Sequence, residues 1–197
     1  MRRLARRGGR IYLRAPRPAD RAEVLRLNRA SRRFYRGLVM PPVTARAWSA
    51  YLARRRRLES PGYLVCRASD GAIVGGININ EIVRGVFRSG YLGYQIGAPH
   101  ARQGYMTEAL ALVLREAFGP LRLHRVEANI QPGNRASIGL VRRAGFRLEG
   151  LSRRYLKIGG RWRDHERWAL TVEDWRRRRR SGRGRRQRGR PGPRPSA

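Results

Sequence analysis

Apolar residues recur along the chain at two spacings, one that alternates and one of three or four positions. Alternating or short apolar runs predict strands at 11–15 (IYLRA), 90–97 (GYLGYQIG) and 124–132 (HRVEANIQP). The clearest hairpin is 63–79 (YLVCRASDGAIVGGINI), in which Asp70-Gly71 predicts a type I′ turn, because both central positions of that turn need a positive φ. A last pair of strands is predicted in 146–172, around a Gly-Gly turn.

Helical spacing predicts a first helix capped by Asp20 and a second that follows Thr44. The clearest apolar stripe predicts a helix from about 106 to 118, which Gly119-Pro120 ends; its members are Met106, Ala109, Leu110, Val113, Leu114 and Ala117. A short helix is predicted in 134–145 (NRASIGLVRRAG), with a capping Asn at its start and a Gly at its end. This order of elements is typical of one α+β domain, α/β-like, with a mixed twisted sheet and helices on both faces.

The formal net charge is +33, and nearly all of it is arginine, because Lys157 is the only lysine. Residues 176–197 hold eleven arginines and residues 1–10 hold five, with no acid in either segment. We therefore predict a basic N-terminal arm (1–10), one folded domain (11–175) and a disordered Arg/Gly/Pro-rich tail (176–197). Such a field attracts polyanions such as RNA and phosphate-bearing small molecules; arginine supplied by coding bias is the alternative explanation.

A single cysteine, Cys66, rules out an intrachain disulfide and favours a reducing compartment. No apolar run has the length of a signal peptide or of a membrane span, so the sequence predicts a cytoplasmic protein without a membrane partner. His100 and His124 lack any metal-ligand spacing, so no metal site is predicted.

The loop at 98–105 runs from a strand directly into the striped helix. Backbone N–H groups at such a helix start are unpaired and carry partial positive charge, so they can hold an anion such as a pyrophosphate. The candidate donors belong to Gln103, Gly104, Tyr105, Met106 and Thr107, and Gly104 lets a ligand approach the backbone closely. The loop is neither a P-loop nor a dinucleotide fingerprint, and an ordinary helix start remains an alternative.

The segment 101–109 (ARQGYMTEA) resembles the acetyl-CoA pyrophosphate loop of the GCN5-related N-acetyltransferase (GNAT) superfamily. Three further segments resemble the RimJ-type enzymes, which acetylate the N-terminal alanine of ribosomal proteins: 83–97 (VRGVFRSGYLGYQIG), 127–150 (EANIQPGNRASIGLVRRAGFRLEG) and 159–171 (GGRWRDHERWALT). The resemblance covers about residues 11–175. It departs from the family pattern at Ala101, where Gln or Arg is usual, and at Met106, where Gly or Ala is usual; Arg102 or Gln103 can supply the missing polar contact.

The resemblance implies acetyl-CoA as cosubstrate and a splay between two central parallel strands, where backbone N–H groups at Ile96 and Gly97 face the thioester carbonyl. It implies Ser137 as general acid, because Ser137 matches the Ser of the family's Asn-x-x-Ser motif near the CoA sulfur. Many relatives have a Tyr one helical turn later, where this chain has Val141. Asn134 is expected to contact the pantetheine or to order the helix start, and a purely structural role of Ser137 in the first turn remains open.

Two polar residues of the strand at 124–132, Glu127 and Asn129, share one face. Only Glu127 titrates, so it is the candidate general base, with a surface ion pair as the alternative. Glu108, Asp164 and His165 are expected to serve structural roles.

The resemblance predicts an N-acetyltransferase for the N-terminal α-amine of a protein, such as a ribosomal protein, with rRNA contact through the basic surface. An α-amine titrates near ~8, against about 10.4 for lysine, so a modest base is enough. The alternatives are an acetyltransferase for a small amine and a non-catalytic protein that binds RNA or the ribosome.

Overall fold

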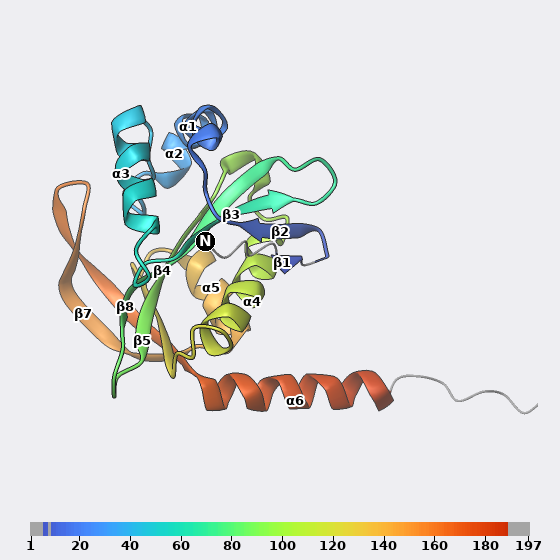
Figure 1. The fold of residues 1–197 in the computed structure, drawn as a ribbon. Helices are drawn as coiled ribbons and strands as arrows, with labels where there is room; N and C mark the ends of the chain where they lie inside the picture. Colours follow the sequence, from blue (N-terminus) through green and yellow to red (C-terminus); the bar gives the residue numbers. More distant parts are fainter. Residues whose placement is uncertain (1–5, 8, 189–197) are drawn as a thin grey trace, which may run out of the picture.

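One mixed sheet runs through the molecule and carries the helices on its two faces (Figure 1). The computed structural model describes residues 6–7 and 9–188. Within them the sheet has eight strands in the order β1-β2-β3-β4-β5-β6-β8-β7. The strands are β1 (Arg6–Arg7), β2 (Ile11–Arg14), β3 (Gly62–Arg67), β4 (Ile73–Val83), β5 (Ser89–Ile96), β6 (Arg125–Ile130), β7 (Arg147–Ile158) and β8 (Arg161–Thr171).

The helices divide between the two faces of the sheet. They are α1 (Arg21–Ala30), α2 (Arg32–Tyr35), α3 (Ala45–Arg55), α4 (Tyr105–Phe118), α5 (Arg135–Ala144) and α6 (Val172–Arg188), with short 3-10 turns η1 (Pro18–Asp20) and η2 (Ala98–His100). Helices α1 and α3 cover one face, and α4 and α5 cover the other. The predicted mixed α+β fold is therefore confirmed.

Strand β3 shows how sequence alternation produces this layering. Leu64 and Cys66 pack against α1 and α3, whereas Tyr63 and Val65 pack into the larger core under α4. Because successive side chains of a strand point to opposite faces, a strand covered on both sides is apolar throughout. The predicted hairpin 63–79 is confirmed as β3 and β4.

The centre of the sheet opens between β5 and β6. These are the only parallel neighbours among the described strands, and their pairing ends at Tyr91 and Glu127. Beyond this point β5 continues to Ile96 beside β4, and β6 continues to Ile130 beside β8. The two strands therefore splay apart, as the resemblance implies.

Two local expectations are wrong. Asp70 does not adopt a positive φ, so the hairpin turn is not type I′. Arg67 N–H donates to the Ala72 carbonyl oxygen, which leaves a four-residue loop with a positive φ only at Gly71, and the Asp70 carboxylate pairs with Arg67. Asp20 precedes α1 but does not cap it, because its carboxylate accepts hydrogen bonds from Arg14 and from Arg17 N–H.

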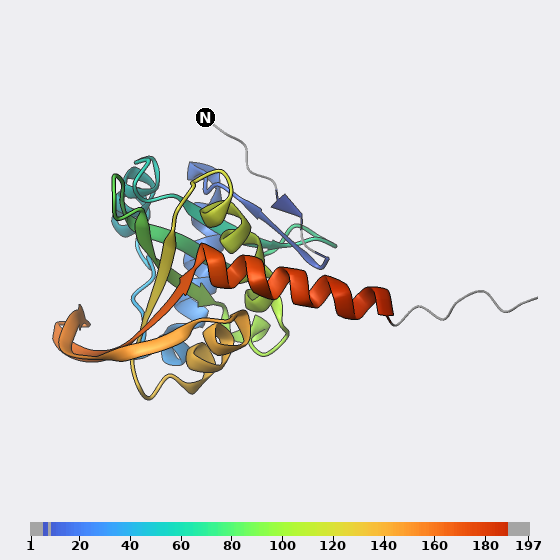
Figure 2. The same ribbon diagram turned by 90° about the horizontal axis from the view of Figure 1, so that it is seen from below.

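The expected disorder of 176–197 is wrong for residues 176–188, which belong to α6; residues 189–197 lie outside the described part of the chain. Arginine has a high helix propensity, and two acids in the first turn suit the positive end of the helix dipole. Trp175 packs against Phe118 with ring centroids 5.3 Å apart, and Arg178 donates to the Arg143 carbonyl oxygen. From this anchored first part α6 projects away from the sheet (Figure 2).

Candidate active site

The loop before α4 forms an anion cradle from its backbone. Gly104 is the N-cap of α4, with φ at +83°, and Arg102 also has a positive φ, of +61°. The Gly104 carbonyl oxygen accepts hydrogen bonds from Thr107 and Glu108 N–H. Thr107 N–H is therefore committed to the helix, contrary to expectation, and the donors that no described acceptor takes belong to residues 103–106.

Side chains around the cradle hold it in place. The Gln103 side-chain amide donates to the Pro99 carbonyl oxygen at 2.8 Å, so it stabilises the loop, whereas Arg102 lines the adjoining pocket. Glu108 accepts hydrogen bonds from the backbone N–H of Arg10 at 2.9 Å and from its Nε at 2.7 Å. Burial alone would raise the pKa of Glu108, but these bonds lower it, which fits the expected structural role. Arg10 also lies over the Tyr105 ring and adds positive charge beside the loop.

At the splay, β5 presents unused backbone groups. Gly97 N–H donates to the Val74 carbonyl oxygen on β4 at 2.8 Å. Because successive N–H groups of an extended strand point to opposite edges, Ile96 N–H points into the gap beside β6. Gly97 itself does not line the pocket, and a side chain there would collide with Leu27 of α1. Of the two expected donors, only the Ile96 N–H faces the gap, whereas the Gly97 N–H pairs with β4 and the lack of a side chain at Gly97 leaves room for Leu27.

Helix α5 starts beside this gap. The Asn134 side-chain oxygen accepts a hydrogen bond from Ser137 N–H at 3.2 Å, so Asn134 is the cap of α5 while it also lines the pocket. Ser137 is half-buried and neighbours Tyr94 of β5. Burial raises the pKa of Tyr94 to about 12, and the Ser137 side chain opposes that shift. Tyr94 Oη meets no partner at hydrogen-bond geometry among the described residues, so the two hydroxyls are neighbours and not a bonded pair.

A pocket of about 590 Å³ joins these parts and passes through the splay to the other face of the sheet. On the α4 and α5 side its lining includes Arg102, Met106, Thr107, Asn134 and Ser137. The far end is lined by Phe34 and Tyr35 of α2, Leu38 and Val39 after it, Asn129 and Gln131 after the splay, and Leu156, Ile158 and His165 of the β7–β8 hairpin. Gln131 Nε2 donates to the Gly37 carbonyl oxygen at 2.6 Å, which ties the segment after α2 to this end.

Glu127, the expected base, does not line this pocket. Its carboxylate lies 2.8 Å from Arg125 Nε, and Arg125 also pairs with Glu149. Glu127 is opposite Tyr91, the last paired position before the splay, whereas Asn129 lies beyond it. The ion pair that was the alternative for Glu127 is therefore present, and the position of Glu127 outside the pocket lining disfavours it as the general base.

Three buried side-chain oxygens in the pocket have no hydrogen-bond partner among the described residues: Tyr35 Oη, Tyr94 Oη and Asn129 Oδ1. Buried polar atoms are nearly always hydrogen-bonded, so orphans that line a pocket indicate ligand partners. With the free N–H groups at 103–106 and the arginines at 102, 135 and 143, the pocket offers donors at one end for a polyphosphate and polar groups at its middle.

The model of the acetyltransferase (GNAT) domain matches residues 10–147. The chain belongs to the GNAT family. The probable N-acetyltransferase YjcK of Bacillus subtilis (strain 168) is 32% identical over 178 residues, which cover 85% of this chain and 97% of that protein. The ribosomal protein uS5-alanine N-acetyltransferase of Escherichia coli (strain K12) is 44% identical over 103 residues, 52% of this chain and 53% of that protein.

A solved GNAT structure shows the same architecture with the cofactor bound. Mycobacterium smegmatis RimJ in complex with CoA-disulfide matches with a TM-score of 0.77 and 29% identity, over 88% of this chain and 90% of that one. This enzyme is therefore a GNAT N-acetyltransferase with acetyl-CoA as cosubstrate, and its pocket fits that molecule through the cradle at one end and the orphan hydroxyl and amide near the splay.

Within the described residues, no group of three or more His, Cys, Asp and Glu side chains could hold a metal ion. No described helix combines the length and the apolar character that crossing a bilayer would require.

Periodicity and spacing missed several residues of the site. Arg10 contacts the phosphate loop from a distant part of the sequence, beside β2, and no sequence signal indicates this. Tyr94 was visible only as an apolar strand position, and its alternation with Leu92 and Ile96 places all three on the α4 side. His165 lies in the RimJ-like WRDH segment, which was the available signal for its place in the pocket.

Proposed function

We propose that this GNAT enzyme transfers the acetyl group of acetyl-CoA directly to the N-terminal α-amine of a protein, most simply an N-terminal alanine. The similarity to enzymes named for ribosomal protein uS5 alanine and to RimJ supports this substrate class. The observation that carries the proposal is the pocket that crosses the splay with arginines at its CoA end and, among the described residues, no carboxylate in its lining.

A pocket without a carboxylate disfavours polycationic acceptors. Polyamines and lysine side chains arrive with strongly basic ammonium groups, which need a negative charge to bind and a strong base to lose a proton. An N-terminal α-amine is partly neutral near pH 8, so it suits this surrounding. Phe34 and Leu38, which are 49% and 40% exposed, offer apolar surface at the mouth for the first residues of a chain.

Within the proposal, the N–H groups of residues 103–106 hold the pyrophosphate, with Arg102 beside it. Ile96 N–H polarises the thioester carbonyl, because a fixed dipole aimed at the developing oxyanion lowers the barrier. Ser137 donates a hydrogen bond to the departing thiolate, and Asn134 orders the start of α5 so that Ser137 faces the gap.

The test follows thiol release from acetyl-CoA with peptides that start with Ala or Ser, a panel of small amines and a control without acceptor. Turnover with the Ala-starting peptide supports the proposal. Turnover with a small amine alone would contradict the proposal and indicate an acetyltransferase for small molecules. Binding of acetyl-CoA without turnover of any peptide or amine contradicts the proposed acceptor, and failure to bind acetyl-CoA would favour a non-catalytic role.

Contact with ribosomal RNA through α6 is part of the proposal, as is action in the cytoplasm. Arg176 to Arg180 are exposed on a helix that leaves the body of the molecule (Figure 2). Lys and Arg contacts with phosphates release counterions, so such binding weakens steeply with salt. Replacing Arg176, Arg177 and Arg180 by Gln should weaken binding of an rRNA fragment and flatten its salt dependence. Replacing the exposed Arg56 and Arg57 after α3 is the control, and equal effects of both sets would contradict a role of α6.

A further inference from the structure

His165 occupies the acceptor end of the pocket. It lies on β8 opposite Ser152 of β7, is 3% exposed and lines the pocket with Leu156 and Ile158. Asn129 pairs with Arg167, two residues from His165, so Asn129 and His165 project from the same face of the sheet as diagonal neighbours. Ser137 lies on the opposite side, with α5.

The hydrogen bonding of His165 fixes which ring nitrogen is basic. Nδ1 lies 2.9 Å from the Arg163 carbonyl oxygen. A carbonyl oxygen only accepts, so Nδ1 carries the proton, and in the neutral imidazole Nε2 then holds the free lone pair. No described residue takes a hydrogen bond from or gives one to Nε2. The ring is therefore held in the tautomer that a base requires.

The other side chains of the pocket cannot do this work. Arginines do not release protons at neutral pH, and burial raises the pKa of Tyr35, Tyr91 and Tyr94, which keeps these phenols neutral. His100 lies at the phosphate loop, against the edge of Tyr105, where burial and the nearby Arg67 guanidinium lower its pKa. Among the described pocket residues, His165 is left as the base at the acceptor end.

Asn129 supplies an independent observation at the same place. Its Oδ1 is buried, lines the pocket and has no partner among the described residues. An amide oxygen there can accept a hydrogen bond from an ammonium or amine N–H. We propose that His165 is the general base that takes the proton from the acceptor amine while Asn129 Oδ1 holds that amine in line with the splay. This role rests on the proposed function.

The proposed transfer moves two protons, one to His165 and one to the thiolate. His165 Nε2 takes one proton from the α-ammonium and later passes it to solvent. The freed nitrogen lone pair forms a C–N bond with the thioester carbonyl carbon, and the tetrahedral intermediate breaks the C–S bond. The second proton, lost by the acylated nitrogen, goes to the thiolate on the Ser137 side. The products are the acetylated amine and CoA, with one proton released.

The experiment compares His165→Asn and His165→Ala in the full chain, with an Ala-starting peptide as acceptor. The Asn side chain can keep the hydrogen bond to the Arg163 carbonyl oxygen but has no basic nitrogen, so it separates structure from catalysis. The Ala variant leaves room for added imidazole, which can replace the missing base. His124→Ala is the control, because His124 is half exposed and pairs with Glu173 outside the pocket. Thermal unfolding and CoA affinity are measured for every variant.

We expect kcat to fall about 10²-fold in both His165 variants at unchanged CoA affinity, and imidazole to restore about tenfold in the Ala variant alone. Wild-type kcat in the Asn variant, or no response of the Ala variant to imidazole, would overturn the base role and leave His165 as a structural residue. Loss of peptide acetylation in the wild type itself, with CoA still bound, would overturn the proposed function and the role of His165 together.

Discussion

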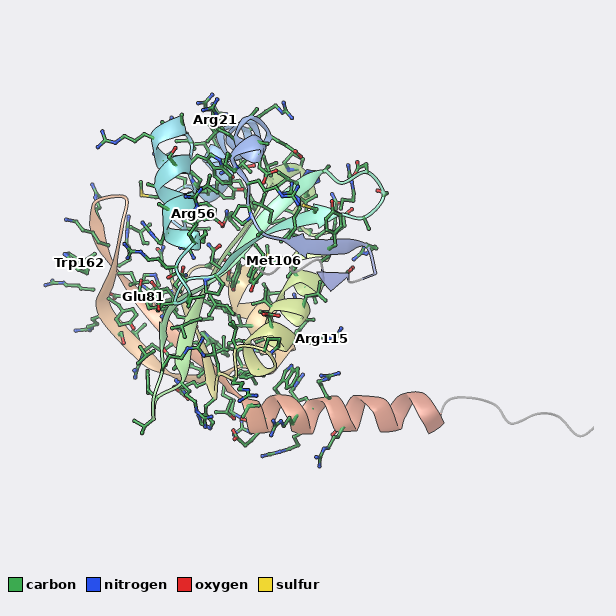
Figure 3. All side chains as sticks on the ribbon, viewed as in Figure 1. Arg21, Arg56, Glu81, Met106, Arg115 and Trp162 are labelled. Carbon is green, nitrogen blue, oxygen red and sulfur yellow. The ribbon has the colours of Figure 1, made fainter. Side chains whose placement is uncertain are left out.

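The two ends of the pocket are built from different material. At the proposed CoA end, the groups available to a ligand are backbone N–H groups at the start of α4 and along β5, positioned by Gly104 and by strand pairing. At the acceptor end, the groups are side chains from three separate places: α2, the end of β6 and the β7–β8 hairpin. Figure 3 shows Trp162 on that hairpin, at the outer edge of the molecule.

This difference explains why the CoA end could be recognised from spacing in the sequence, whereas the acceptor end could not. A backbone donor survives substitution of its side chain, so Ala101 and Met106 depart from the family pattern without removing the cradle. A side-chain site depends on which residue lies at each position. On the proposed function, the acceptor end sets the choice of amine, whereas the CoA end binds the cosubstrate that the family shares.

The largest expected effect lies where the two ends meet. Ser137→Ala should lower kcat about 10²-fold, since a positioned proton donor contributes at least that much, while CoA affinity stays unchanged. Steady-state kinetics and calorimetric titration with CoA measure the two separately. Ser181→Ala, on the exposed side of α6, is the control. Equal loss of CoA affinity and kcat would show that Ser137 supports α5 and not the chemistry.

Gly104→Val should weaken CoA binding without changing the acceptor end of the pocket. A β-branched residue at a φ of +83° is strained, and its Cβ would approach Arg10 Nη2 to 2.8 Å. Left-handed backbone costs such a residue about 1–2 kcal/mol, so we expect CoA to bind about 5- to 30-fold more weakly. Gly133→Ala is the matched control, because nothing lies near its side-chain position. Unchanged CoA affinity in the Val variant would rule out the cradle.

Tyr94→Phe tests whether the Tyr94 hydroxyl, which lies where the two ends of the pocket meet, takes part in the transfer. The hydroxyl is buried without a described partner, so its removal should leave the protein as stable or more stable. If ligand or thiolate is its partner, transfer slows about fivefold, the value of about one hydrogen bond. Thermal unfolding together with kcat tests this. Lower stability with unchanged kcat would mean that Tyr94 only packs in the core.

Glu127→Gln should have the smallest effect. Arg125 keeps its pairing with Glu149, and the changed side chain lies outside the pocket lining. The Arg125–Glu127 pair is part-buried, so its loss should lower the stability, whereas kcat should change less than about twofold because Glu127 does not contact the pocket. A large loss of kcat at unchanged stability would restore Glu127 as the base and contradict the division of the pocket described above.

The contrast between Glu127 and Asn129 also marks the limit of sequence reasoning. Alternation correctly placed both on one face of β6. Which of them enters the pocket depends on where β5 and β6 part, one position after Tyr91 and Glu127, and on Arg125, which holds the Glu127 carboxylate. Local spacing shows neither the position at which the pairing of two strands ends nor the carboxylate with which an arginine forms an ion pair.

Local signals predicted what local forces decide. The start of α4 differs by one residue from expectation, Thr44 caps α3, and α5 lies between its predicted caps. Predictions failed where side-chain partners decide. Asp70 pairs with Arg67 three positions away and Asp20 with Arg14 six positions away, and spacing alone does not show which partner a carboxylate takes. Helix α6 continues because its first part is anchored on Phe118 and Arg143, which are distant in the sequence.

The most direct test of the acceptor assignment offers the enzyme a choice within one molecule. A peptide that begins with alanine and contains an internal lysine is incubated with acetyl-CoA, and tandem mass spectrometry locates the added acetyl group. The pocket without a described carboxylate and with a single basic imidazole at its acceptor end predicts acetylation of the α-amine alone. Acetylation of the lysine side chain, or no transfer to the peptide while acetyl-CoA is bound, would contradict it.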